Sequence, residues 1–168
     1  MTKYVYIAVI LLSLTQCTGQ TNKVDNKKNI EDTYKKNISD STLATGWYYI
    51  CDTANGFKRE LDKTVESYFI DPRPIVTKQN FIKLEIFDTD FKGQYKDYTG
   101  LKMMLDEDGT KEWSNATEKA MYKKLALIID NKLINAPEVN AQITSGKTLL
   151  NRTEYSKQEI EAFKKKIE

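Results

Sequence analysis

A run of five consecutive apolar residues, Leu125 to Ile129, constrains the fold of this chain more than any other segment. It begins after Lys124 and ends at Asp130 and Asn131, which are typical turn residues. A short, uninterrupted apolar run between such boundaries is characteristic of a strand that is buried on both faces. The run therefore predicts the central strand of a sheet with apolar layers packed against both of its sides.

Two earlier segments alternate apolar and polar residues, which is the pattern of strands with one buried face. The apolar positions are Ile82, Leu84 and Ile86 in residues 81–87, and Leu101, Met103 and Leu105 in residues 101–105. We expect these segments to be antiparallel neighbours, joined by a loop around Gly93. The acidic stretch from Asp106 to Gly109 is predicted to form the turn that follows.

The first part of the predicted domain is rich in strand-forming residues. Residues 47–51 are aromatic and β-branched, and Asn55-Gly56 predicts a tight hairpin turn because both residues tolerate positive φ. Residues 57–61 would then return as the partner strand. A further strand is predicted over 68–70, and the prolines in residues 71–74 exclude a helix there.

Two helices are predicted near the C-terminal end. In residues 110–123, an apolar stripe at helical spacing comprises Trp113, Ala116, Ala120 and Met121. Ser156 and Glu159 form a capping box, which begins a helix with Ile160, Phe163 and Ile167 on one face. Extended segments are expected over 133–134, 139–143 and 148–150. The fold class is therefore α+β, with a single, mostly antiparallel sheet and both helices packed on one face.

The N-terminal segment resembles a bacterial lipoprotein signal. Lys3 precedes an apolar run over residues 4–14, which is too short for a membrane span of about 20 residues. The run ends in Leu14-Thr15-Gln16-Cys17, which resembles a lipobox with lipidation at Cys17, although Gln16 stands where a small residue is usual. We expect a signal peptide over 1–16, a polar tether over 17–45 and an α+β domain over 46–168. The alternative is a secreted protein in which Cys17 is lost or unpaired.

Composition argues against several classes of function. The 168 residues carry a net charge of +2 and contain no histidine. The near balance of charges gives no electrostatic basis for binding nucleic acid. The absence of histidine removes the commonest general base, the usual partner of a nucleophilic serine or cysteine, and the commonest zinc ligand. We therefore expect no enzymatic activity, no cofactor and no metal, with carboxylate or tyrosine chemistry as the residual alternative.

The remaining candidate residues have structural explanations that fit better than chemical ones. Asp106, Glu107, Asp108 and Glu112 are clustered, but their spacing fails as a calcium loop, so a solvated turn is expected. Asp88 and Asp90 are expected in a polar loop rather than an acid–base pair. Cys51 is expected to be a small core residue. Lys164 to Lys166 are expected at a solvated helix end rather than on anionic lipid. Phe91, Tyr95 and Tyr98 either contact a partner or pack their own loop.

The segment from Leu101 to Ile167 resembles the head of the first periplasmic domain of SecD, a component of the bacterial protein-export machinery. The resemblance begins with residues 101–106, Gly109, Trp113 and Thr117, and it is strongest from Lys124 to Pro137. Val139, Ile143 and Gly146 continue it, and the helix after Tyr155 completes it. Asn131 and Asn151 stand where the family has glycine, and Asn also visits the left-handed region.

The resemblance implies the head alone, a part that contacts translocating polypeptide, without the membrane helices that perform transport in SecD-like proteins. A tethered head can bind, scaffold, sense or inhibit. We therefore expect a protein-binding module in the bacterial cell envelope, periplasm-facing and held to the membrane by lipid, with a protein partner. A periplasmic inhibitor or immunity lipoprotein is the alternative that this sequence leaves open.

Overall fold

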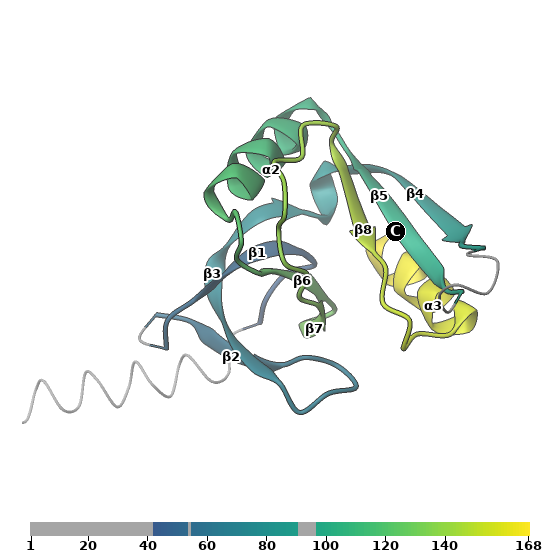
Figure 1. Cartoon of the computed structure of the whole chain (residues 1–168), viewed down its shortest axis with the longest axis horizontal. Coiled ribbons are helices and arrows are strands. Elements are labelled where there is room, and N and C mark those ends of the chain that lie inside the picture. The colour runs from purple at the N-terminus through teal and green to yellow at the C-terminus, as the bar shows by residue number, and fades with distance from the viewer. Residues whose placement is uncertain (1–41, 54, 91–96) are drawn as a thin grey trace, which may run out of the picture. The chain divides into compact units, whose positions relative to one another are not determined.

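The structure is a computed structural model that describes residues 42–53, 55–90 and 97–168. The predicted signal peptide, the lipidation residue Cys17, most of the predicted tether and the loop residues Phe91 and Tyr95 lie outside these ranges. Within them, no helix has the length and hydrophobicity that crossing a membrane requires. The strands form two separate antiparallel sheets, and the view in Figure 1 shows both of them.

The first sheet has five strands in the order β2-β3-β1-β6-β7. They are β1 (Gly46–Cys51), β2 (Phe57–Glu60), β3 (Ser67–Thr77), β6 (Leu125–Ile129) and β7 (Lys132–Asn135). All five residues of β6 are buried, and the strand pairs with β1 on one side and β7 on the other. The prediction of a central strand buried on both faces is confirmed.

The five-stranded sheet curls until its two edges meet. Leu61, directly after β2, forms a parallel bridge with Leu133 of β7, and the amide of Asp62 donates to the Leu133 carbonyl at 2.9 Å. The Arg59 side chain strengthens this closure by donating to the carbonyl and the side-chain oxygen of Asn131. The closed sheet encloses an apolar interior of its own. Its buried members are Leu43, Tyr48, Leu61, Ile70, Ala126, Ile128, Leu133 and Ala136.

The second sheet has three strands in the order β4-β5-β8, which corrects the prediction of a single sheet. These strands are β4 (Phe81–Asp88), β5 (Thr99–Leu105) and β8 (Lys147–Leu150). The predicted antiparallel pairing of residues 81–87 with 101–105 is confirmed. The separation has a physical reason: β6 needs an apolar layer on each face, and the closed first sheet covers only one of them. The second sheet and the helices supply the other layer.

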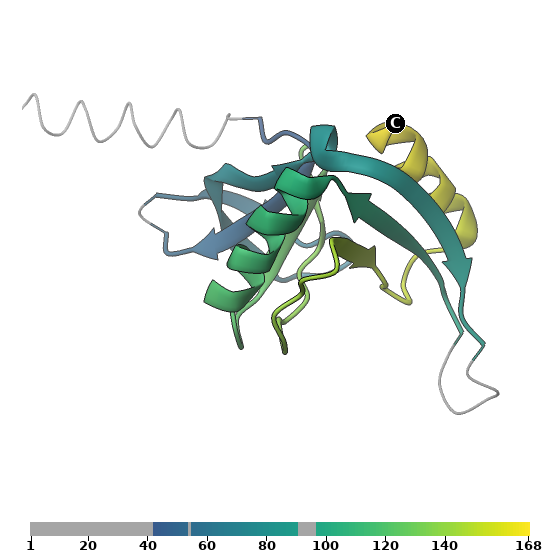
Figure 2. The same cartoon turned by 90° about the horizontal axis from the view of Figure 1, so that it is seen from above.

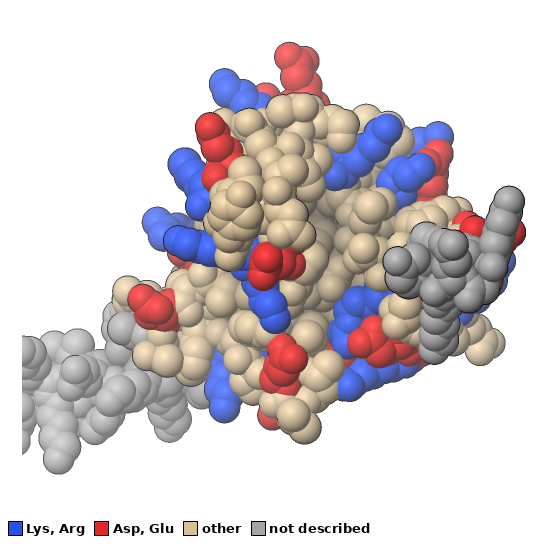
Figure 3. All heavy atoms as spheres, viewed as in Figure 1, with Lys and Arg blue, Asp and Glu red and all other residues tan. Residues whose placement is uncertain are grey.

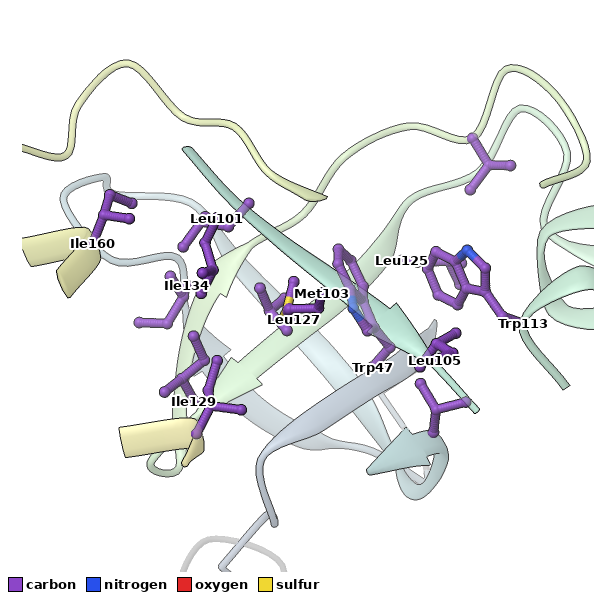
Figure 4. Packing of buried hydrophobic residues seen from close by; sticks show 14 of the residues in the cluster. Trp47, Leu101, Met103, Leu105, Trp113, Leu125, Leu127, Ile129, Ile134 and Ile160 are labelled. Atoms are coloured by element: carbon purple, nitrogen blue, oxygen red, sulfur yellow. The ribbon is translucent and has the colours of Figure 1, made fainter. Parts of the chain in front are cut away.

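The larger core lies between the two sheets. Leu127 of β6 and Trp47 of β1 face Leu101 and Met103 of β5 across this core, whereas their chain neighbours Ala126 and Tyr48 point into the first sheet's own interior. Figure 4 shows β5, with Leu101 and Met103, crossing over Trp47 and Leu127. The side chains of β1 and β6 therefore alternate between two apolar cores, which explains why the sequence of β6 is continuously apolar.

Two helices complete this core: α2 (Glu107–Lys119) and α3 (Lys157–Ile167). Trp113 and Ala120 contribute to it from the α2 segment, and Ile160 and Ile167 contribute from α3. The capping box predicted for Ser156 and Glu159 is present. Figure 2 shows the two helices at opposite ends of the β4-β5-β8 sheet.

The acidic stretch at residues 106–109 is the beginning of α2 and not the predicted turn. Asp106 is the N-cap, and its side chain accepts from the Gly109 amide at 2.7 Å. Glu107 and Asp108 occupy the first turn, where negative charge stabilises the positive end of the helix dipole. These residues favour a helix start because a carboxylate accepts hydrogen bonds from the backbone amides of the first turn, which have no partner within the helix. Within the described ranges, no group of acidic or thiol residues is arranged to hold a metal ion.

The hairpin predicted at Asn55-Gly56 is wrong. β1 pairs with β3 and β6, and β2 pairs with β3, so β3 lies between the two strands expected to be neighbours. β3 is long because it runs through residues 71–74, where the register with β1 shifts. The two prolines lie in this irregularity, where a missing backbone donor is tolerated. They exclude a helix there, as predicted, without ending the strand.

Ile82 does not lie on the buried face of β4, contrary to the predicted alternation. The side chain is 66% exposed, because the pairing with β5 shifts between Phe81 and Lys83. Phe81 packs against the core in its place, followed by Leu84 and Ile86. A one-residue shift of this kind turns a side chain to the other face of the sheet.

The β6–β7 turn matches the prediction for Asn131. Asp130 and Asn131 have φ values of 52° and 62°, so both occupy the left-handed region that glycine usually fills. Asn151 does not follow the same explanation, since it is not among the residues with positive φ in the described part of the chain.

Candidate binding groove

Strand β8 of the second sheet and the segment that precedes this strand in the chain form the walls of a groove of about 530 Å³. One wall is β8 with Asn151, the other is the segment from Pro137 to Ser145, and Trp47, Trp113 and Leu125 line the space between them. The space-filling view shows a hollow whose floor consists mainly of uncharged side chains, with charged side chains on the ridges beside it (Figure 3). We call it the β8 groove.

The 137–145 wall is attached to the rest of the domain along its length. The Val139 amide donates to the Lys123 carbonyl at 2.9 Å, and the Ile143 amide donates to Thr117 Oγ1 at 2.9 Å. Thr117 is fully buried in α2, and its hydroxyl donates in turn to the Trp113 carbonyl. These bonds hold the wall against α2 and the start of β6. The space beside β8 therefore stays open.

The opposite wall is the free edge of a sheet. β8 pairs only with β5 among the described strands. The Leu105 amide donates to the Gly146 carbonyl at 2.8 Å, which places the backbone groups of Gly146 on the β5 side. The direction of the backbone N–H and C=O groups alternates along an antiparallel strand. The backbone groups of Thr148 and Leu150 therefore also point toward β5, whereas those of Lys147 and Leu149 point to the other side.

Two tryptophans form the apolar base of the groove. Trp47 and Trp113 lie with ring centroids 4.9 Å apart and planes tilted by 50°. Trp47 Nε1 donates to Thr148 Oγ1 at 3.0 Å, which connects β1 to the inward face of β8. Trp113 is 3% exposed, and its Nε1 is buried without an acceptor in the described part of the chain. A buried donor without a partner costs about 1–3 kcal/mol.

Charged residues lie on the rim of the groove rather than in its base. Lys102 and Lys147 are on the β5 and β8 side, and Glu138 is on the other wall. Lys102 is paired with Glu85 at 3.1 Å, whereas Lys147 forms no ion pair with any described residue. The rim therefore offers a cation at Lys147 beside an apolar floor.

A second cluster of polar groups joins the two sheets. Arg152 Nη1 donates to the backbone carbonyls of Asp62 at 2.9 Å and Ile134 at 2.8 Å. The Tyr155 hydroxyl lies 3.0 Å from Asp62 Oδ2, and burial is the main reason that its pKa is raised above the usual range. Lys63 pairs with Glu159 at 2.6 Å, and this pairing, with the bonds to Ser156, lowers the pKa of Glu159 to about 2. These groups satisfy one another, so we assign the cluster a structural role.

Asp88, one of the two carboxylates considered for acid–base chemistry, is held by two hydrogen-bond donors. Asp88 ends β4, and its oxygens accept from Thr99 Oγ1 at 2.6 Å and Lys157 Nζ at 3.1 Å. The hydrogen bond from Thr99 is the main reason that its pKa is lowered, followed by the bond from Lys157. A carboxylate held in its charged form by two donors is a weak proton acceptor.

Cys51 was predicted to be a small core residue, but it is not a member of either apolar core. Cys51 is half-buried, and desolvation, followed by the charges of Asp71 and Asp52, raises the pKa of its thiol. Less of the reactive thiolate is present as a result. Within the basic run, Lys164 pairs with Glu168, and Lys166 pairs with Asp130 at 2.6 Å. Tyr98 packs edge-on against Phe87 with ring centroids 6.1 Å apart.

Sequence reasoning did not find the β8 groove. Trp113 was predicted as part of a core stripe and of the SecD-like segment, and residues 148–150 were predicted as a short strand. Neither prediction shows that a strand edge lies beside two tryptophans. The single sequence signal was Pro137, which interrupts regular structure and helps keep the following segment out of the sheet.

A model of the SecDF P1 head subdomain matches residues 55–161, which is more than half of the chain. The chain belongs to the SecDF P1 head subdomain family. The match includes both walls of the β8 groove and Trp113. A comparison with curated proteins found no match.

Solved structures of SecDF share the fold. One of them describes SecDF as a membrane component that enhances protein export; it has 13% sequence identity and a TM-score of 0.57 over 89% of this chain and 70% of its own. A structure of SecDF in a super-membrane-facing form has 17% identity and a TM-score of 0.52 over 59% of this chain. This chain covers only 12% of that protein. At these identities the likeness establishes the fold alone.

Proposed function

We propose that this SecDF-head-like chain is a non-catalytic lipoprotein of the bacterial cell envelope that binds unfolded or extended polypeptide in the β8 groove. The observation that carries the proposal is a fixed, open groove that combines a strand edge with two tryptophans. Aromatic side chains are effective anchors for protein ligands, and a strand edge recognises backbone without requiring one sequence. SecDF, which shares the fold, is described as enhancing protein export.

Other features agree with binding rather than catalysis. The ionisable side chains in the groove lining are Lys102, Glu138 and Lys147. Two lysines and one glutamate beside an apolar floor form a lining that suits binding better than general acid–base or covalent chemistry, which supports the non-catalytic part of the proposal. Its apolar floor and polar rim resemble the anatomy of a protein interface.

Filling the groove tests the proposal. Ala141 lines the groove and is exposed, so Ala141→Trp places a bulky ring in the binding space without disturbing a packed core. We expect the full chain to bind a reduced and alkylated, permanently unfolded protein, and the variant to bind it at least about tenfold more weakly. Fluorescence anisotropy of the labelled unfolded protein measures both affinities, and the native, disulfide-bonded form of the same probe is expected to bind weakly.

Ala162→Trp is the matched control, because Ala162 is exposed on α3 and is not part of the groove lining. It makes the same change of side chain at a distant site and is expected to leave affinity unchanged. Equal affinity of both variants and the parent chain, or no binding of the unfolded probe by the parent, would contradict the proposed function.

Attachment through Cys17 is the second part of the proposal and has its own test. Cys17→Ala removes the thiol that the lipobox-like sequence Leu14-Thr15-Gln16-Cys17 would present for lipidation. We expect the parent chain in the membrane fraction of a bacterial host and the variant in the soluble fraction of the envelope. Cys51→Ala, a cysteine of the folded domain, controls for general effects of removing a thiol. Membrane fractionation of Cys17→Ala that matches the parent would exclude this mode of attachment.

A further inference from the structure

We infer that the β8 groove recognises its ligand as an added antiparallel strand, paired to the backbone of Lys147 and Leu149, with an apolar anchor and an acidic neighbour. This inference rests on the proposed function and specifies the class of polypeptide that the groove accepts. It depends on the direction of backbone groups in β8, on the floor of the groove, and on the charge at its rim.

The backbone of β8 offers hydrogen bonds that the described protein does not use in a sheet. The bond between the Leu105 amide and the Gly146 carbonyl fixes the phase of the β5–β8 ladder. In that phase, the N–H and C=O groups of Lys147 and Leu149 point away from β5. An antiparallel strand laid along this edge would exchange hydrogen bonds with both residues. Since β8 has four residues, the paired length is about 13 Å.

The two faces of β8 determine which side chains the added strand can carry. Thr148 faces inward, where its hydroxyl accepts from Trp47 Nε1, so a ligand residue opposite Thr148 points toward the two tryptophans. That position favours an apolar side chain.

The outward face adds a preference for charge. Lys147 and Leu149 lie on this face, and Leu149 is 40% exposed. Across the ladder, Lys147 is opposite Met104, and Lys102 on the same face is already paired with Glu85. Lys147, which has no ion-pair partner among the described residues, therefore favours an acidic ligand side chain directly opposite, and Leu149 favours an apolar one. In the antiparallel direction the ligand order is apolar, apolar anchor, acidic.

Backbone methylation of a peptide tests strand addition directly. The probe is a labelled octapeptide with a central Val-Ile-Asp flanked by serine and threonine, and binding to the full chain is followed by fluorescence anisotropy. N-methylation of the Val or the Asp removes an N–H that would bond to β8, whereas N-methylation of the Ile alters an N–H that points away. We expect the first two peptides to lose at least about tenfold in affinity and the third to retain most of it.

Two variants of the protein test the same geometry from the other side. Leu149→Pro removes a donor on the free edge while sparing the bonds to β5, and circular dichroism reports whether the variant is folded. Lys147→Glu is expected to weaken the Val-Ile-Asp peptide and to strengthen a Val-Ile-Lys peptide. This exchange of preference is specific to the position of Lys147 and cannot arise from a general loss of stability.

The outcomes separate this inference from the proposed function. Equal affinity of all three N-methylated peptides would overturn strand addition, even if the unfolded protein still binds and Ala141→Trp still blocks it. An unchanged charge preference in Lys147→Glu would overturn the assignment of the acidic position. Absence of binding by the unfolded protein would instead overturn the proposed function.

Discussion

Replacing Trp47 with alanine is expected to lower the free energy of unfolding by about 3–5 kcal/mol, the range for removing a large aromatic side chain from a core. Trp47 is 1% exposed, lies in the core between the two sheets, and contacts Trp113 at a centroid distance of 4.9 Å. Its removal also leaves Thr148 Oγ1 without the indole donor. Equilibrium unfolding in urea, monitored by circular dichroism, measures the loss.

Trp47→Phe distinguishes the contribution of volume from that of the hydrogen bond. It retains most of the aromatic surface but loses the bond to Thr148, so its destabilisation should fall well below that of Trp47→Ala. If Trp47→Ala unfolds at the same urea concentration as the parent, then the core between the sheets is not the main apolar contact of this domain.

The second large effect is expected for Arg152→Leu, which should lower the free energy of unfolding by about 1–3 kcal/mol. It leaves the Asp62 carbonyl without a donor and leaves the Ile134 carbonyl with the Tyr155 hydroxyl alone. The Arg152 side chain is 10% exposed, and one nitrogen donates to the carbonyls of both Asp62 and Ile134. Asp62 belongs to the segment that closes the first sheet, whereas Arg152 follows β8 of the second sheet. The guanidinium therefore links the two sheets, and urea unfolding reports its contribution.

Glu154→Gln is the control for charge at the same place. Glu154 contacts Arg152 at 3.4 Å but is 48% exposed, and exposed ion pairs contribute about 0–1 kcal/mol. If Glu154→Gln destabilises the chain as much as Arg152→Leu does, the effect comes from charge and not from the bonds to the two carbonyls.

Local sequence patterns correctly predicted the strands and helices that are determined by residues close together in the chain. The apolar run at residues 125–129 predicted a strand buried on both faces, and the capping box at Ser156 predicted the beginning of α3. The alternation in residues 81–87 and 101–105 predicted their antiparallel pairing. Each pattern depends on neighbours a few positions away, and in each case burial and local hydrogen bonds favour the same structure.

Predictions failed where a contact between distant residues outweighed a local preference. Asn55-Gly56 is a good hairpin sequence, yet β3 inserts between the strands on either side of it because it pairs with both. The stretch from Asp106 to Gly109 failed for a different, local reason: its composition suits both a turn and the first turn of a helix, and Asp106 caps α2 by accepting from the Gly109 amide. The register shift after Phe81, which exposes Ile82, depends on pairing with β5 and leaves no mark in the alternation.

The sequence alone determined that residues 125–129 form a central strand that needs apolar cover on two faces. Successive side chains of a strand point to opposite faces, so five consecutive apolar residues make both faces apolar, and all five are buried in the structure. The tertiary structure decided what provides that cover: a closed sheet on one face, and a second sheet with two helices on the other. It also decided the β8 groove, whose walls and floor come from segments far apart in the chain. Packing brings these segments together. The strand edge that remains free depends on how the two sheets assemble, and no local sequence pattern indicates it.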